Sequence, residues 1–440
     1  MKHKENKESG MLAELLNAAE AAKPVLVKII PVKLLRMCKK HLLKANFCRI
    51  SKKRIPFQAG HDARGVNLIG NIKLEAGLGK SCRLVASILE QAGAALDIYQ
   101  YAQAGADNIG DTTWDHRILG GLHYQINLIH INPTELADAF SAIDPSVWDF
   151  RYQIAFWLWE LEEVPDAWLP YFQCMDEIWA PSEFVCEAIR KKTALPVKHM
   201  PYYVHAQIHR QYHREYFGIP KNQFLFLVMY DSYSCAERKN PQAAFRAFRE
   251  AFAKENQKVG LVIKIGHPTQ QDEAWIADIL EGYSNLYLIK DLLDSDEVYS
   301  LIQCVDAVVS LHRAEGFGLV LAEAMLLGTP VIATNWSANT EFMDENTACM
   351  VDCRLVKIEK DIPPFPAGGR WAEPDIRQAA QYMQKLYTDR QFCMELSQRA
   401  KVHVNKVLSM ERAKKQMSDR LENIWQELGE NLRQFAEREK

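Results

Sequence analysis

Short apolar runs recur along the first half of the chain, and segments with helical spacing of apolar positions separate them. The runs predict strands, and one helix is expected over 80–92. Ser182 is a predicted N-cap for a helix that ends at Arg190. Short buried strands that alternate with helices are typical of parallel sheets built from βαβ units. The predicted strands are 66–72, 95–99, 125–131, 152–159 and 177–180.

The same rhythm starts again after Gly218. We therefore expect an α/β protein with two Rossmann-like, doubly wound domains, 61–215 and 216–405, which face each other across a cleft. The long polar helix 409–440 would complete the first domain, and 1–60 would form a helical basic N-terminal extension. Because ligands of such sheets bind beyond the carboxyl ends of the strands, the cleft is the predicted site. The second domain has predicted strands at 224–229, 261–265, 285–289, 307–310 and 331–333 and helices at 241–253, 273–280, 295–304 and 318–327.

Composition narrows the class of protein. The chain has 440 residues, 48% hydrophobic and 25% charged, which excludes disorder as its main state. The net charge of −3 gives no case for nucleic-acid binding by the chain as a whole. We expect no transmembrane helix, since no apolar run reaches about 18 residues, and no secretory signal. The ten scattered cysteines are typical of reduced thiols, so a cytoplasmic location is expected.

The charge is unevenly distributed. From Lys23 to Arg54 there are eleven Lys and Arg residues and no Asp or Glu, with aliphatic residues between them. This mixture is typical of helices that bind an anionic membrane surface, which would make the protein peripheral on the inner face of the cytoplasmic membrane. Two alternatives stay open, namely packing on the acidic body of the same chain and RNA binding.

The strongest chemical signal is the segment 310–325, where a strand ends, a glycine-containing loop follows and a helix begins. The start of a helix suits an anionic or polyhydroxyl ligand. Glu315 lies in the loop, and Glu323 lies about one and a half turns into the helix. Two carboxylates there suit the hydroxyl groups of a sugar. The alternative is a helix cap at Glu315 and an unrelated helical glutamate at Glu323.

The spacing of Glu315 and Glu323 and the flanking Glu-Gly-Phe-Gly and Ala-Glu-Ala-Met resemble the nucleotide-sugar site of retaining family-four glycosyltransferases. The resemblance spans about residues 65–405 and implies the GT-B fold of two Rossmann-like domains, with 61–215 as the acceptor domain and 216–405 as the nucleotide-sugar donor domain. It also implies that Glu315 contacts the donor sugar and Glu323 the nucleotide ribose. The backbone of Phe317, Gly318 and Leu319 would lie near the sugar and the diphosphate.

Arg238 and Lys239 follow the first strand of the second domain. A basic pair before Asn-Pro is by itself more often a solvated turn, but the resemblance implies a clamp on the donor diphosphate. Many relatives have an arginine five residues before the lysine, where this chain has Ser234. Positive charge is needed there because negative charge develops on the leaving diphosphate.

Other candidates are weaker, and the resemblance supplies each one. Gly77 and Gly79 follow the first strand and would let the backbone approach the donor phosphate, although a plain strand-to-helix turn is the alternative. His130 would lie by the reaction centre, or Asn132 in its place; a structural role is the alternative for the histidine. Leu293 lies in the loop expected to meet the nucleobase.

Strand alternation puts Trp157 and Trp159 on one face, where they form either an aromatic wall for a sugar or a buried core stripe. Trp159 and Glu160, together with Asn132, are candidate acceptor contacts. Arg370 to Asp375 resembles a family segment that positions the chain between domains, or it is a capping turn before a helix.

Together these features predict a retaining, metal-independent hexosyltransferase without a cofactor, with a nucleoside-diphosphate sugar as donor. The resemblance favours a mannosyl donor and a lipid-linked or polysaccharide acceptor in bacterial surface-glycan assembly. The alternatives are a nucleotide-sugar epimerase and a non-catalytic nucleotide-sugar-binding protein. A glycoside hydrolase is disfavoured, because no separate acid–base pair of carboxylates is evident.

Overall fold

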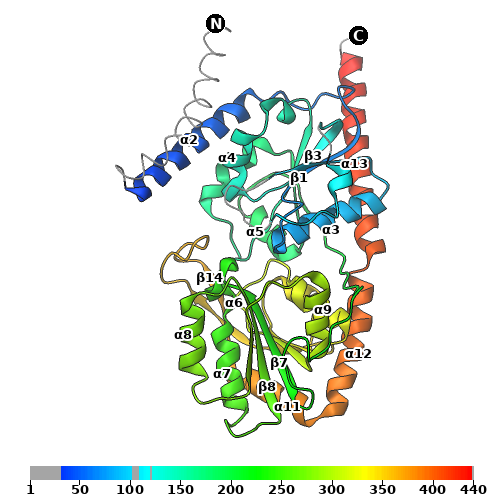
Figure 1. The fold of residues 1–440 in the computed structure, drawn as a ribbon. Helices are drawn as coiled ribbons and strands as arrows, with labels where there is room; N and C mark the ends of the chain where they lie inside the picture. Colours follow the sequence, from blue (N-terminus) through cyan, green and yellow to red (C-terminus); the bar gives the residue numbers. More distant parts are fainter. Residues whose placement is uncertain (1–30, 102–108, 119–120, 439–440) are drawn as a thin grey trace.

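The computed structural model describes residues 31–101, 109–118 and 121–438. Figure 1 shows two α/β domains, one above the other, each built on a twisted sheet with helices on both faces. The upper sheet has the order β2-β1-β3-β4-β5-β6 and the lower sheet the order β12-β11-β10-β7-β8-β9. All pairings within both sheets are parallel. The predicted two-domain α/β fold is therefore confirmed.

The upper domain forms its strands where apolar runs were predicted, because these residues fill the space between the sheet and its helices. Val66, Leu68 and Ile126 are fully buried there. The sequence prediction missed the short edge strand β6, helix α4, which starts at Pro133, and the 3₁₀ segment η3. The elements are β1 (Ala63–Gly70), α3 (Gly77–Gln91), β2 (Leu96–Gln100), β3 (Tyr124–His130), α4 (Pro133–Ala142), β4 (Tyr152–Phe156), the 3₁₀ segment η3 (Asp166–Cys174), β5 (Glu177–Ala180), α5 (Glu183–Arg190) and β6 (Val197–His199). Ser182 caps α5 as predicted, since its side chain accepts a hydrogen bond from the Val185 N–H.

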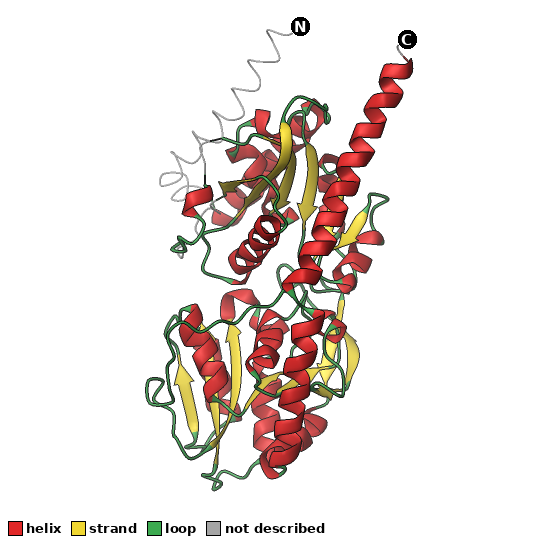
Figure 2. Ribbon diagram, turned by 90° about the vertical axis from the view of Figure 1, so that its right-hand side faces the viewer, coloured by secondary structure: helices red, strands yellow, loops and turns green. Residues whose placement is uncertain are grey.

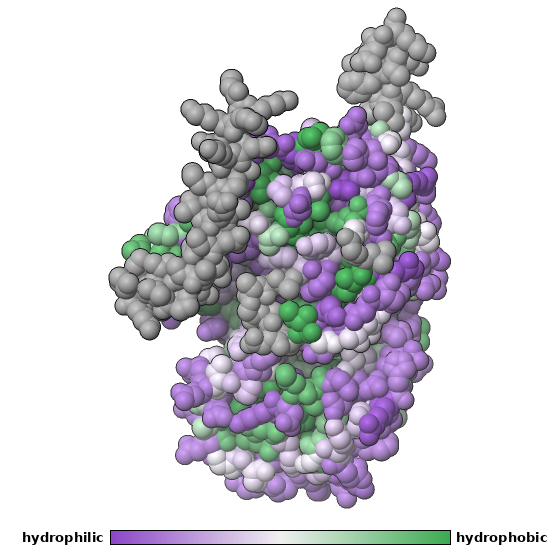
Figure 3. Space-filling model, turned by 45° about the horizontal axis from the view of Figure 1, so that its top comes forward, coloured by the Kyte–Doolittle hydropathy of each residue, from purple (hydrophilic) through white to green (hydrophobic). Residues whose placement is uncertain are grey.

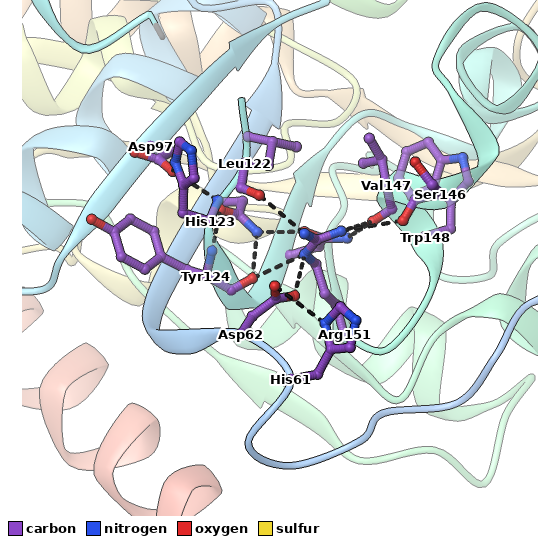
Figure 4. A network of polar contacts seen from close by, with 12 residues as sticks. His61, Asp62, Asp97, Leu122, His123, Tyr124, Ser146, Val147, Trp148 and Arg151 are labelled. Carbon is purple, nitrogen blue, oxygen red and sulfur yellow. Dashed lines mark hydrogen bonds and ion pairs between the residues drawn. The ribbon is translucent and has the colours of Figure 1, made fainter. Parts of the chain in front are cut away.

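A polar network ties together the amino ends of the upper strands, away from the cleft (Figure 4). At its centre is Arg151, whose side chain is largely buried. The guanidinium donates to backbone carbonyls of Leu122, Tyr124, Ser146 and Val147 at 3.0–3.3 Å. It also pairs with Asp62 at 3.0 Å. These bonds satisfy a buried charge and fix three loops in place.

The lower domain repeats the pattern, and strand β10 and helix α9 have the predicted bounds. The sequence prediction missed β12, helices α11 and α12, and the hairpin of β13 and β14, whose register pairs Leu355 with Ala372. The elements are β7 (Phe224–Asp231), α6 (Ala236–Lys239), α7 (Pro241–Ala251), β8 (Val259–Gly266), α8 (Gln270–Ile279), β9 (Leu286–Ile289), α9 (Ser295–Cys304), β10 (Ala307–Ser310), α10 (Leu319–Leu327), β11 (Val331–Thr334), β12 (Cys349–Val351), β13 (Cys353–Lys357), β14 (Arg370–Pro374), α11 (Ile376–Thr388) and α12 (Arg390–Val407).

The last helix, α13 (Met410–Arg438), leaves the lower domain and runs along the side of the upper one (Figures 1 and 2). It buries Met417, Leu421 and Ile424, and its Arg420 pairs with the buried Glu177 of β5. The chain crosses between the domains twice, after β6 and before α13. The two crossings touch, because the Val204 N–H donates to the Leu408 carbonyl at 3.0 Å.

Helix α2 (Val32–Lys53) packs on the upper domain beside α4 and η3. Leu43, Phe47 and Ile50 are buried in that contact, whereas Leu34 and Met37 face solvent. The described part of the basic segment thus packs in part on the body; residues 23–30 lie outside the described residues. Among the described helices, none combines the length and apolar character needed to cross a bilayer. Figure 3 shows one face of the molecule as mainly hydrophilic, with hydrophobic patches on both halves.

Candidate active site

A cavity of about 790 Å³ lies between the domains, at the carboxyl ends of both sheets. This volume is within the range typical of small-molecule sites. The upper wall comes mainly from the turn into α3 and the loops after β3, β4 and β6. The lower wall comes from the β7–α7 and β10–α10 loops, from His267 after β8 and from the start of α10. The lining residues include Gly77, Leu78, Ser81, Asn132, Glu160, Tyr202, Tyr233, Arg238, Lys239, His267, Glu315, Phe317, Gly318, Leu319 and Phe365.

A cluster of charges lies in this cavity and joins residues far apart in the sequence. Lys239 Nζ lies 2.5 Å from Glu315 Oε1, and Arg238 Nη1 lies 3.3 Å from Glu315 Oε2. Glu160 reaches the same arginine across the cleft, at 3.8 Å. The structure therefore brings together four of the predicted residues: Glu315, Arg238 and Lys239 from the lower domain and Glu160 from the upper.

The cations keep the central carboxylate ionised. Burial alone would raise the pKa of Glu315, but the charges of Lys239 and Arg238 outweigh it and lower the pKa to about 2. Burial would conversely lower the pKa of Arg238, and the charges of Glu315 and Glu160 raise it. Arg238 also donates to the carbonyls of Ala314 and Ser234, at 2.8 and 3.1 Å. Its Nε has no hydrogen-bond partner, so one buried donor of this guanidinium remains unused.

Glycines shape the loop that carries Glu315. Gly318 has φ of +99° at the start of α10, a conformation that favours glycine. A Cβ on Gly316 would lie 2.7 Å from the Trp159 carbonyl oxygen of the upper domain. Ser182 in turn donates to the Gly316 carbonyl at 2.8 Å. The loop is thus pressed against the upper domain, and Phe317, Gly318 and Leu319 line the cavity.

Glu323 does not line this cavity, contrary to the predicted arrangement. Its buried carboxylate pairs with Lys80 of α3, from the opposite domain. The same lysine contacts the hydroxyl of Tyr299 in α9 at 2.9 Å. Leu293 is also absent from the cavity wall. In this structure, therefore, the two predicted carboxylates face different surroundings: Glu315 faces the cavity, and Glu323 faces a cation across the cleft.

His130 is fully buried, which corrects its predicted place beside the reacting groups. As the last residue of β3 it points inward, where its ring stacks on Phe156 and its Nε2 lies 2.6 Å from Ser81 Oγ. Burial lowers the pKa of His130 to about 4, so the ring is neutral near pH 7. Ser81 also contacts the Tyr202 hydroxyl, and these two residues line the cavity in its place.

Two further predicted residues have structural roles. A Cβ on Gly79 would lie 1.9 Å from the Leu74 carbonyl oxygen, so this glycine allows the turn to pack and does not face the cavity. Trp159 is buried, and its indole donates to the Glu163 carbonyl at 2.8 Å. It packs on Trp168 and Phe365 as core, so the predicted acceptor contact is wrong for Trp159. Gly77, Asn132 and Glu160 do line the cavity.

Sequence reasoning missed several lining residues. Ser81 and Tyr202 carry no motif, and Tyr202 follows a strand that was not predicted. Tyr233 and His267 each come just after a predicted strand, so their places at the carboxyl ends were a usable signal. Within the described residues, no three His, Cys, Asp or Glu side chains gather to hold a metal ion, and metal independence stays a prediction.

Comparison with known proteins identifies a family match for the second domain. Residues 212–403, somewhat less than half of the chain, match the family model described as "Glycosyl transferases group 1". A comparison with curated proteins finds no match.

Solved structures share the fold at low sequence identity. Anabaena HepE, solved with UDP and glucose, matches with TM-score 0.56 and 12% identity over 82% of this chain and 100% of that chain. A glycosyltransferase from Rickettsia africae matches with TM-score 0.59 and 14% identity, over 82% and 99% of the two chains. Sucrose-phosphate synthase from Thermosynechococcus elongatus matches with TM-score 0.60 and 15% identity, over 82% and 99%. The fold is that of GT-B proteins, and the family match supports glycosyl transfer.

Proposed function

We propose that this protein is a glycosyltransferase that moves a sugar from a nucleoside diphosphate to an acceptor with retention of configuration. The observation that carries the proposal is the cluster of Glu315, Arg238 and Lys239 at the carboxyl ends of the lower strands. A sugar diphosphate offers hydroxyl groups for the carboxylate and phosphate oxygens for the cations. All three residues line one cavity large enough for such a molecule.

The cations have the chemistry that the transfer needs. When the bond between the sugar and the diphosphate breaks, negative charge develops on the phosphate oxygen, and fixed positive charge stabilises it. Arg238 and Lys239 are held in place by Glu315, so they are oriented before the donor arrives. This arrangement supports a reaction without a metal ion, in which the residues of the chain provide the positive charge.

Glu315 has the properties of a group that positions the donor sugar. Its carboxylate is ionised, buried and adjacent to the start of α10, and a carboxylate is a good acceptor for the hydroxyl groups of a sugar. The turn into α3 brings the backbone of Gly77 and Leu78 to the opposite side of the same cavity. Closure of the two domains over the donor would exclude water, which would otherwise hydrolyse it.

We further propose that Glu323 holds the ribose of the donor and that Leu293 lies near its base. Lys80 contacts one carboxylate oxygen of Glu323 in the structure described here. Binding of the ribose then requires either that Lys80 withdraws or that the ribose uses the other oxygen.

The finer parts of the proposal concern the acceptor and the location. We infer a hexose donor, with mannose favoured, and a lipid-linked or polysaccharide acceptor in bacterial surface-glycan assembly. We also infer a cytoplasmic protein that rests on an anionic membrane surface. Helix α2 supports this, since its exposed side chains include Lys40, Lys44, Leu34, Met37 and Leu42. Lysines beside exposed aliphatic residues favour such a surface.

The test is a panel of nucleotide sugars, with thermal shift to find the donor and product analysis to find the reaction. We expect a transferred sugar and a released nucleoside diphosphate. Glu315→Ala should lower the rate by at least about 100-fold. Glu373→Ala is the matched control, since Glu373 pairs with Arg313 at 2.8 Å but does not line the cavity.

The same experiment separates the alternatives. An epimerase would release a free sugar product without an acceptor. A binding protein would bind a nucleotide sugar with no turnover at all. Wild-type rates in Glu315→Ala would contradict the proposed function.

A further inference from the structure

Tyr233 is an exposed aromatic residue inside the cleft. Its side chain is 80% exposed, although it lines the cavity together with His267. One face of the ring is covered, because the imidazole of His267 stacks on it with centroids 4.2 Å apart and planes 10° apart. With one face covered by His267, a flat aromatic surface is left exposed at the cavity.

One carboxylate contacts both residues of this stack. Asp231 Oδ1 accepts a hydrogen bond from the Tyr233 N–H at 2.8 Å. The same carboxylate lies 3.0 Å from His267 Nδ1. Asp231 therefore holds the backbone of Tyr233 and orients the imidazole of His267. Asp231 fits there because Gly266 has no side chain: a Cβ on Gly266 would lie 2.8 Å from Asp231 Oδ2. A ring ordered before binding loses little entropy when a ligand stacks on it.

The position of the stack within the cleft indicates which ligand it meets. Ser232, next to Tyr233, bonds to Asp272 of α8 at 2.8 Å, whereas the pair of Glu323 and Lys80 lies beside Tyr299 of α9. Figure 1 shows α8 and α9 on opposite sides of the lower domain. The proposed place for the ribose and Tyr233 therefore lie towards opposite sides of the lower domain, with Arg238 and Lys239 in α6, the short helix that follows Tyr233.

We propose that the open face of Tyr233 is a stacking platform for a pyranose ring of the acceptor glycan. The C–H face of a pyranose is apolar and flat, and it matches an aromatic face, while its hydroxyl groups reach the polar groups of the cavity. The proposal rests on the proposed function, because it assumes that the acceptor approaches the sugar beside Glu315. It adds a binding site that the charged cluster by itself does not require.

The experiment uses the full chain with saturating UDP and four probes, the methyl α-glycosides of mannose, glucose, galactose and N-acetylglucosamine. Saturation-transfer NMR detects binding, and titration gives the dissociation constant of the best probe. We expect Tyr233→Ala to raise that constant about tenfold, a typical size for the loss of one aromatic contact. Tyr233→Phe should stay within about twofold, because the ring is retained.

Tyr216→Ala is the matched control, since Tyr216 is 56% exposed and packs on the ring of Tyr212, at 4.3 Å between centroids, but does not line the cavity. It should bind glycoside and UDP as the wild type does. The proposal is overturned if no glycoside binds the wild type, if Tyr233→Ala binds it unchanged, or if Glu315→Ala alone abolishes binding. A weaker UDP complex in Tyr233→Ala would instead make the platform a nucleobase site and overturn the glycan assignment. Failure of the wild type to bind any nucleoside diphosphate would contradict the proposed function itself.

Discussion

Among the residues that the structure describes, Arg151 and Arg238 are buried arginines whose surroundings differ in kind. Arg151 lies at the amino ends of the upper strands, where its guanidinium donates hydrogen bonds to four backbone carbonyls and pairs with Asp62 (Figure 4). Arg238 lies at the carboxyl ends of the lower strands, between two carboxylates from different domains, and keeps an unused donor. The first arrangement is complete without a ligand, whereas the second is arranged to receive an anion. Burial of a charge therefore does not identify a functional residue, but the balance of its partners does.

Substitution of Arg151 is expected to have the largest effect on the stability of the fold. Arg151→Met should lower the free energy of unfolding by about 3–5 kcal/mol, because it leaves several buried carbonyls and Asp62 without their donor. Urea denaturation measures this change. The turnover number of the molecules that remain folded should be unchanged. A lower turnover number in a fully folded sample would contradict a purely structural role for Arg151.

Arg238→Met is expected to affect catalysis instead. Loss of positive charge at the leaving diphosphate should lower kcat by about 100–1,000-fold. Lys239 still pairs with Glu315, so unfolding should change much less than in Arg151→Met. Steady-state kinetics and urea denaturation on the same sample test both halves, and a stability loss equal to that of Arg151→Met would refute the distinction.

The charge cluster also predicts a pH dependence. The folded pKa of Glu315, about 2, is below its ordinary value of 4.5, so the folded state favours the ionised form. The stability this contributes is fully present above about pH 4.5 and is lost as the pH falls through about 2. It corresponds to about 3 kcal/mol. The stability difference between wild type and Glu315→Gln should thus be constant from pH 8 to pH 5 and shrink below. A difference that changes between pH 5 and 8 would contradict this.

The smallest expected effect concerns Glu135, a carboxylate whose pKa is raised in the folded state. Burial, together with the nearby charge of Asp138, raises the pKa of Glu135 to about 7. The folded state then binds the proton more tightly, so stability falls as the pH rises from about 4.5 through 7. Glu135→Gln should raise the free energy of unfolding at pH 8 by about 1 kcal/mol, since part exposure weakens the effect. No gain at pH 8 would show that Glu135 is better solvated than its surroundings indicate.

The sequence predicted what depends on local pattern. Apolar runs placed ten strands at the right positions, and the strand–loop–helix pattern around Glu315 located the cluster. Contacts between distant residues left no such pattern. Lys80 lies 243 positions from Glu323, and nothing near either residue indicates their pairing. Trp157 and Trp159 are both buried and both pack on Trp168, so they form the core stripe that was one of the two alternatives; the alternation alone could not distinguish it from an aromatic wall.

The two chain crossings between the domains have a mechanical consequence. The backbone hydrogen bond from the Val204 N–H to the Leu408 carbonyl joins the two crossings, so they act as a single hinge. Two rigid domains joined at a single hinge move by rotation about that hinge, and sliding of one domain past the other is resisted. For a given rotation, paired groups far from the hinge separate most. The distance between the side chains of a cross-domain pair such as Arg370 and Glu162 therefore reports how far the domains have opened.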